Sequence, residues 1–154
     1  MKNLFIIILT SLFLVNCNNS NPMMNQWSDK SSEFEGVPAF DKMSPELVKE
    51  AMLKGMEMSL EDIDKIANNL DVPTFENTIE EMERSGKLLN DVYPYYGILS
   101  SNMSSPEFRI IQRELAPKLS EYSSLISQNE KLFERVSAIY KASKINPLEN
   151  DQQR

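Results

Sequence analysis

Histidine is absent from this sequence of 154 residues, and cysteine occurs once. Without histidine the sequence has no Ser-His-Asp or Cys-His catalytic arrangement, no H-E-x-x-H zinc helix and no Cys2His2 metal site. A single cysteine closes no internal disulfide and builds no thiolate metal cage. We therefore assign no catalytic residue, no metal ligand and no cofactor to these residues.

Basic residues are also few, with 16 Lys plus Arg against 23 Asp plus Glu and a formal net charge of −7. Phosphate-binding surfaces need clustered Lys and Arg, and no such cluster occurs here, so we expect no nucleic-acid partner. Glycine is scarce as well, and Ser85-Gly86-Lys87 lacks the earlier glycine that a Walker motif requires. The balance of 41% hydrophobic and 25% charged residues is typical of a folded domain.

The first residues predict an export signal. A short basic start, Met1-Lys2-Asn3, precedes residues 4–15, which are apolar except for Thr10 and Ser11. This run is shorter than the roughly 20 apolar residues of a membrane-spanning helix. We therefore predict a secretory signal peptide over residues 1–16, with a buried core helix as the alternative.

Cys17 stands where the apolar run stops, at the end of the string LVNC. This string resembles a bacterial lipobox, whose cysteine becomes the lipidated first residue of the mature chain, although Asn16 replaces the usual small residue. We predict lipidation of Cys17 and attachment to a membrane of the bacterial cell envelope. An ordinary cleavage site beside a free thiol is the alternative. The polar residues that follow suit a flexible tether, predicted over 17–35.

Helical signals repeat through residues 36–154, and no stretch alternates with period two for long enough to predict a strand. We predict an all-α fold of bent amphipathic helices in a helical bundle, with N-caps at Ser44, Thr74, Ser104 and Asn129. The predicted inward stripes are Val48, Met52, Met56, Leu60, Ile63, Ala67 and Leu70; Phe75, Ile79, Met82, Leu89, Val92 and Tyr96; Phe108, Ile111, Leu115, Leu119, Tyr122 and Ile126; and Leu132, Val136, Ile139 and Tyr140.

The second stripe passes through Gly86 and is predicted as one continuous helix with a bend at Pro94. A second bend is predicted at Pro117, in the third helix. Clustered carboxylates are interpreted as a solvated helix face, because acids precede bases by four residues. The expected pairs are Glu61–Lys65, Glu80–Arg84, Glu83–Lys87 and Glu114–Lys118.

Three tyrosines, Tyr93, Tyr95 and Tyr96, form the densest aromatic patch of the sequence. They are candidate contacts for a bound peptide, since aromatic rings present apolar area together with a polar tip. The alternative is that they plug a corner of the bundle.

Several strings occur in an order that is informative when taken together. They are PAFDK at 38–42, PTFENTI at 73–79, ERSG at 83–86, RELAPKL at 113–119 and LFERV at 132–136. Their order and spacing resemble the N-terminal part of the peptidyl-dipeptidase Dcp, oligopeptidase A and thimet oligopeptidase family of zinc metallopeptidases.

The resemblance implies an almost wholly helical enzyme with a deep channel that cleaves short peptides. In that family zinc is bound by an H-E-x-x-H helix in a distant C-terminal segment, which no position here matches. Residues 36–154 are thus expected to be an incomplete channel-wall scaffold, inactive alone, and zinc is expected only in a full-length member. The partners left open are short peptides and a complementary catalytic fragment; a free-standing helical lipoprotein that binds peptides or a partner protein is the alternative function.

A scaffold segment of this kind has a physical consequence for the isolated chain. Amphipathic helices that pack on a larger body leave apolar surface open when that body is missing. We therefore expect the isolated chain to be helical but marginally stable or self-associating.

Overall fold

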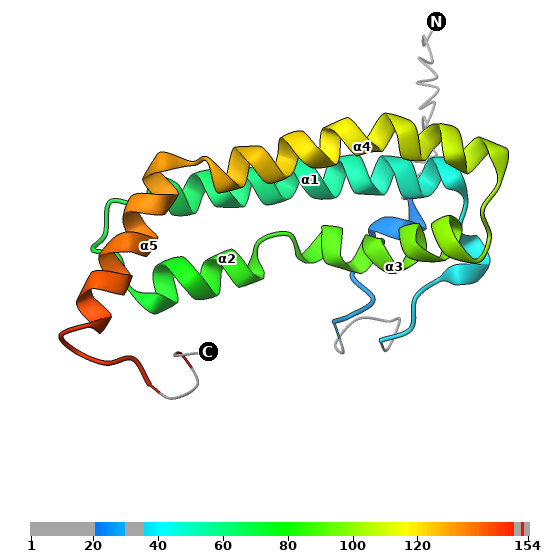
Figure 1. Cartoon of the computed structure of the whole chain (residues 1–154). Coiled ribbons are helices and arrows are strands. Elements are labelled where there is room, and N and C mark those ends of the chain that lie inside the picture. Colours follow the sequence, from blue (N-terminus) through cyan, green and yellow to red (C-terminus); the bar gives the residue numbers. More distant parts are fainter. Residues whose placement is uncertain (1–20, 30–35, 150–151, 153–154) are drawn as a thin grey trace, which may run out of the picture.

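The computed structural model describes residues 21–29, 36–149 and 152. Within this part of the chain every regular element is a helix, which confirms the all-α prediction (Figure 1). The long helices are α1 (Pro45–Ala67), α3 (Lys87–Ser101), α4 (Pro106–Ser127) and α5 (Glu130–Ser143). The short elements are η1 (Pro22–Met24), η2 (Phe40–Lys42), the π-helical η3 (Phe75–Glu80) and α2 (Glu81–Arg84).

The predicted signal peptide over residues 1–16 and the predicted lipidation site Cys17 lie outside the described residues. None of the helices in the described part combines the length and apolar composition needed to cross a bilayer.

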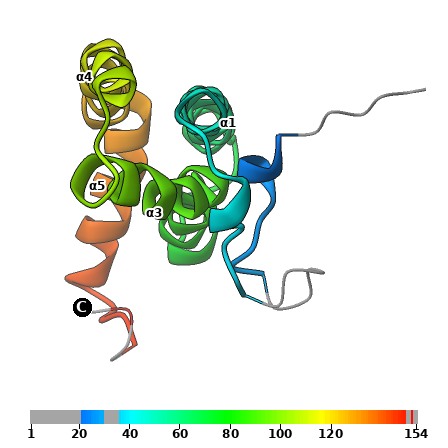
Figure 2. The same cartoon turned by 90° about the vertical axis from the view of Figure 1, so that its right-hand side faces the viewer.

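Helices α1 and α4 run side by side along the length of the molecule (Figures 1 and 2). Helix α3 packs against the first half of α1, while η3 and α2 accompany its second half. Helix α5, orange in Figure 1, crosses the far end of the molecule and contacts α1 and η3 there. We call this far end, where α1 finishes, the α5 end.

Helix starts follow the local capping chemistry closely. The predicted caps at Ser44, Thr74 and Asn129 are confirmed, each accepting a hydrogen bond from the backbone N–H three residues later. The cap predicted at Ser104 is wrong, because Ser105 accepts the hydrogen bond from the Phe108 N–H at 3.2 Å. Ser105 directly precedes a proline at the first helical position, where a missing N–H costs nothing.

The second predicted helix is not continuous. It ends at Arg84 with Ser85 as the C-cap, and Gly86 adopts a φ of +74° before α3 begins. A Cβ atom at Gly86 would lie 3.1 Å from the Ser59 hydroxyl, which shares a hydrogen bond of 2.9 Å with the Tyr122 hydroxyl. The break therefore brings backbone against a polar contact between α1 and α4, and glycine permits both the close approach and the positive φ. Pro94 lies inside α3, which continues through it.

Two apolar clusters lie on either side of this polar contact. The main core is built by η1, α1, α3 and α4, and the smaller end core by α1 and α5, with half-buried Met82 and Ile126 packed against it. The buried residues of the main core are Met23, Val48, Ala51, Met52, Met56, Leu88, Leu89, Val92, Tyr95, Leu99, Phe108, Ile111 and Leu115. Those of the end core are Ile63, Ile66, Ala67 and Leu132.

Two residues at the ends of predicted stripes do not face inward. Leu70 is completely exposed because α1 ends at Ala67 and the chain leaves the helix before reaching it. Tyr140 is 61% exposed because α5 is covered on one face, where Leu132 and Ile139 are buried. Helical spacing predicted both residues as part of the core. That prediction is wrong for Leu70 because α1 ends before it, and for Tyr140 because no element covers its side of α5 in the described part of the chain.

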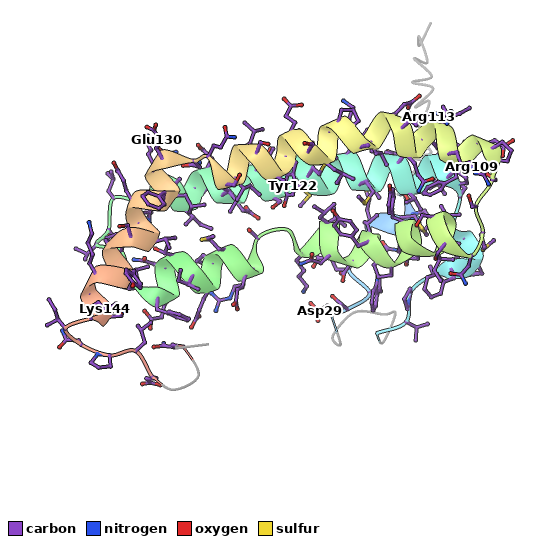
Figure 3. All side chains as sticks on the ribbon, viewed as in Figure 1. Asp29, Arg109, Arg113, Tyr122, Glu130 and Lys144 are labelled. Atoms are coloured by element: carbon purple, nitrogen blue, oxygen red, sulfur yellow. The ribbon has the colours of Figure 1, made fainter. Side chains whose placement is uncertain are left out.

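The predicted tether is also corrected where the structure describes it, at residues 21–29. Met23 is fully buried in the main core, and the side-chain amide of Asn21 donates to the Leu47 carbonyl at 2.7 Å. The indole N–H of Trp27 donates to the Asp91 carbonyl at 2.7 Å, and Asp29 lies beside Lys87 at the start of α3 (Figure 3). A few separate side chains anchor this segment, and they follow no helical or strand period. For this reason its polar sequence did not predict that it packs on the fold.

Candidate functional site

The predicted peptide-contact tyrosines lie near the N-terminal entry to the fold. Tyr95 is completely buried, and its hydroxyl accepts a hydrogen bond from the Ala39 N–H at 2.8 Å. Its ring meets Phe40 edge-on, with centroids 5.4 Å apart, and burial raises the pKa of the Tyr95 hydroxyl. Tyr95 therefore plugs the bundle here and does not reach solvent as a peptide contact would.

The other two tyrosines form an edge-on pair with ring centroids 6.4 Å apart. Tyr96 is half-buried against Phe108, whereas Tyr93 is 41% exposed. Desolvation still raises the pKa of the Tyr93 hydroxyl. Of the three predicted residues, Tyr93 presents the most surface to a ligand.

The richest polar site in the described part of the chain is at the α5 end, around the buried side chain of Arg135. Its Nη1 donates to the carbonyls of Asn69 at 2.6 Å and Asp71 at 3.1 Å. Its Nη2 donates to Asn77 Oδ1 at 2.8 Å and Thr78 Oγ1 at 3.1 Å, and Nε reaches Thr78 Oγ1 at 3.2 Å. We call these five residues the Arg135 cluster.

Asn77 connects the Arg135 cluster to the start of η3. Its Oδ1 accepts the Thr74 N–H at 2.8 Å, while its Nδ2 donates to the Val72 carbonyl at 2.9 Å. Because Asn77 also caps η3 reciprocally with Thr74, one side chain fixes both the helix start and the loop before it.

The Arg135 cluster is a structural clamp rather than a reactive site. All of its acceptors are neutral oxygens, and no ion pair to Arg135 forms among the described residues. A guanidinium stays charged in proteins and transfers no proton, and here its donors are already engaged by the protein. The chemistry available to it is to hold the loop between α1 and η3.

Arg135 is not among the predicted site residues, although its sequence position carries a signal. Arg135 lies between Leu132 and Ile139 at helical spacing, so it occupies a position of the buried stripe of α5. A buried guanidinium needs several acceptors, and the adjacent polar pair Asn77 and Thr78 sits inside the string PTFENTI. Only the folded chain brings these distant residues together.

Comparison with known proteins gives a family. No protein-family model matches the chain. It is 30% identical over 104 residues to dipeptidyl carboxypeptidase of Escherichia coli (strain K12), an alignment that covers 68% of this chain and 15% of that protein. It is 29% identical over 97 residues to oligopeptidase A of the same organism, covering 63% of this chain and 14% of that protein.

The chain is a partial member of the dipeptidyl carboxypeptidase and oligopeptidase A family. The family predicted from the ordered strings is thereby confirmed. A third relative, dipeptidyl carboxypeptidase of Salmonella typhimurium, is 26% identical over 122 residues, covering 79% of this chain and 17% of that protein. The chain thus spans about one-sixth of the length of these curated relatives or less.

Open hollows flank the Arg135 cluster of this family member. One of about 440 Å³ lies between the loop and α5, lined by Ala67, Asn68, Asn69, Leu70, Asp71, Pro73, Lys131, Glu134 and Arg135. Another, of about 460 Å³, lies on the η3 side, lined by Lys65, Ile66, Asn69, Glu76, Asn77, Glu81 and Arg84. Among the described residues, no group of His, Cys, Asp or Glu is arranged to hold a metal ion.

Of the expected charge pairs, Glu80–Arg84 forms, with Nη2 and Oε2 2.7 Å apart. The other three bases or acids find different partners: Lys65 contacts Asp62, Lys87 contacts Asp29, and Glu114 contacts Lys49. Such exposed pairs contribute little to stability, because solvent screens the attraction and holding two long side chains together costs conformational entropy. The side chains of these pairs are all partly or largely exposed to solvent.

Proposed function

We propose that residues 36–154 are a scaffold segment, part of the channel wall of a dipeptidyl carboxypeptidase- or oligopeptidase A-type zinc metallopeptidase that acts on short peptides. The observation that carries this proposal is the 30% identity to a dipeptidyl carboxypeptidase over only 15% of that enzyme. In this proposal the segment supplies shape and support, and the catalytic residues and the zinc belong to the rest of such an enzyme.

The use of polar side chains in the structure supports a scaffold role. The side chains of Arg135, Asn77 and Thr78 form hydrogen bonds with each other and with backbone carbonyls. Tyr95, the most deeply buried aromatic hydroxyl, is likewise engaged by the Ala39 N–H. Groups engaged in this way hold the backbone and are not free to act on a substrate.

The proposal includes export and lipid attachment through Cys17. Since the segment from Asn21 onward packs on α1, the connection from Cys17 spans at most about 14 Å. The scaffold would therefore lie close to the membrane surface. Expression in a bacterium with labelled palmitate tests this: label should enter the wild-type chain and be lost in Cys17→Ser, and equal labelling of both would contradict lipidation there.

An exchange experiment tests the peptidase role. In Escherichia coli dipeptidyl carboxypeptidase, the stretch that this chain matches is replaced by the matching residues of this chain. We expect the chimera to hydrolyse a short peptide, and we expect neither this chain alone nor an enzyme with the stretch deleted to do so. A chimera that is folded by circular dichroism and gel filtration, yet no faster than the deletion, would refute the proposal.

A further inference from the structure

The four most exposed large apolar side chains in the described part of the chain lie at the α5 end, and a fifth exposed one, Tyr140, lies with them on α5. Leu70, Ile145, Val72 and Phe133 are 100, 81, 80 and 69% exposed, and Tyr140 on α5 is 61% exposed. Single exposed apolar residues are ordinary, but a concentration of them at one end marks an interaction surface. We call these five residues the α5-end surface.

The loop that carries Leu70 and Val72 is held rigidly from behind. Nη1 of Arg135 donates to the carbonyls of Asn69 and Asp71, on either side of Leu70. Nδ2 of Asn77 donates to the Val72 carbonyl. These hydrogen bonds hold the loop backbone in the conformation that leaves Leu70 completely exposed. Side chains held in place before binding lose little conformational entropy on contact, which favours their use as anchors.

The α5 end also has little apolar packing of its own. Four buried residues make up the end core, whereas thirteen make up the main core in the described part of the chain. On α5, Phe133 and Tyr140 are seven residues apart and therefore follow one exposed strip, which lies roughly 80–100° around the helix axis from the buried Leu132. This helix therefore has a second apolar side without a covering layer among the described residues.

We propose that the α5-end surface docks against the body of a peptidase of this family, meaning the portion outside the stretch that this chain matches. This inference rests on the proposed function and names its contact surface. The matched stretch is 14–17% of each relative, so a body many times larger accompanies it there. A second copy of the chain fits less well, because two molecules of net charge −7 repel each other.

The experiment uses the chimera and the intact chain, each with two pairs of substitutions. The test pair is Leu70→Asp with Val72→Asp, and the matched control is Val37→Asp with Met103→Asp, whose side chains are 64 and 58% exposed in the wild type. We expect the test pair to lower the midpoint of thermal unfolding of the chimera by about 2–4 °C and to leave the intact chain unchanged. The control pair should leave the midpoint of both proteins unchanged.

The outcomes separate the two proposals. Docking is overturned, with the proposed function intact, when the chimera hydrolyses peptide and the test pair leaves its midpoint unchanged or matches the control pair. The proposed function fails, with docking intact, when the test pair alone lowers the midpoint and the chimera is no faster than the deletion. A chimera without cooperative unfolding overturns docking, because the α5 end then fails to fit that body.

Discussion

Around α3 the chain buries Val48, Val92 and Phe108 completely, whereas around α5 the most prominent buried side chain is a guanidinium. The main core is held by many apolar contacts, whose free energy depends on the area buried and little on the orientation of the groups. The Arg135 cluster is held by a few hydrogen bonds whose geometry is exacting. The hydrogen bond between Ser59 on α1 and Tyr122 on α4 lies between the half of the molecule with the main core and the half with the Arg135 cluster.

This difference teaches that the two halves should fail in different ways. In the main core the loss on substitution should follow the volume removed, because the cavity left behind relaxes only in part. In the Arg135 cluster the loss should follow the number of hydrogen-bond partners stranded, because unsatisfied buried groups are costly.

The largest effect is expected from Phe108→Ala in the main core. Phe108 is fully buried and meets Tyr96 edge-on, so truncation should lower the free energy of unfolding by about 3–5 kcal/mol. Urea denaturation followed by circular dichroism measures the change. Ile110→Ala, two residues away and 51% exposed, is the control and should cost less than about 1 kcal/mol. Equal losses in both would contradict the assignment of Phe108 to the core.

The next effect is expected from Arg135→Met at the α5 end. Methionine keeps the length of the side chain but leaves the Asn69 and Asp71 carbonyls without their donor, so we expect a loss of about 2–4 kcal/mol. Arg135→Lys should recover only part of it, because a lysine ammonium lacks the planar fork of donors. Urea denaturation of all three proteins checks this. A methionine variant as stable as the wild type would show that the clamp is dispensable.

Gly86→Ala should cost about 1–3 kcal/mol at the boundary between the halves. Its positive φ strains any side chain, and the new Cβ would meet the Ser59 hydroxyl at 3.1 Å. Gly97→Ala is the matched control, since a Cβ there meets nothing within 4 Å inside α3, and it should be neutral or stabilising by up to about 1 kcal/mol. Thermal unfolding compares the two, and a Gly86 variant as stable as the Gly97 variant would place no close contact at the break.

Trp27→Phe tests whether the N-terminal segment belongs to the main core. The phenyl ring retains apolar area but cannot donate to the Asp91 carbonyl, so we expect a loss of about 1 kcal/mol. Limited proteolysis should also cut faster near residues 21–29. Unchanged cleavage and stability would return this segment to the role of a tether.

The smallest effect concerns Glu107 in the first turn of α4. Hydrogen bonds from its own backbone N–H and from Ser105 lower the pKa of this carboxyl in the folded chain. The ionised form therefore favours folding above the unfolded-state pKa, and its contribution is lost as pH falls through the folded-state pKa. Glu107→Gln should flatten the fall in thermal midpoint between about pH 5 and pH 3 relative to wild type. Parallel curves would contradict a role for this charge.

Local sequence chemistry predicted much of the fold. Ser44, Thr74 and Asn129 start helices because capping needs only a side-chain oxygen and an N–H three residues on. The predicted helix bounds were wrong where two adjacent residues could both serve as a cap, and where a contact distant in sequence interrupted a helix. Ser104 and Ser105 both suited a cap, and Gly86 suited a helical stripe until its approach to Ser59 was known.

The candidate site was less predictable than the fold. Tyr95 and Tyr93 lie two residues apart, yet one is buried and the other 41% exposed, because the covering residues Ala39 and Phe40 come from a distant segment. The Arg135 cluster joins residues 57 to 66 positions apart, and no local pattern encodes such pairing.

By itself the sequence determined the helical class, most helix starts and the family, because these depend on spacing and on ordered strings within short reach. Only the tertiary structure decided which side chains are covered at the helix ends, where Leu70 and Tyr140 stay exposed while Arg135 is buried. It also decided that residues 21–29 pack on the main core. The physical reason is that burial and hydrogen bonding of buried polar groups depend on partners far along the chain, which hydrophobic periodicity does not specify.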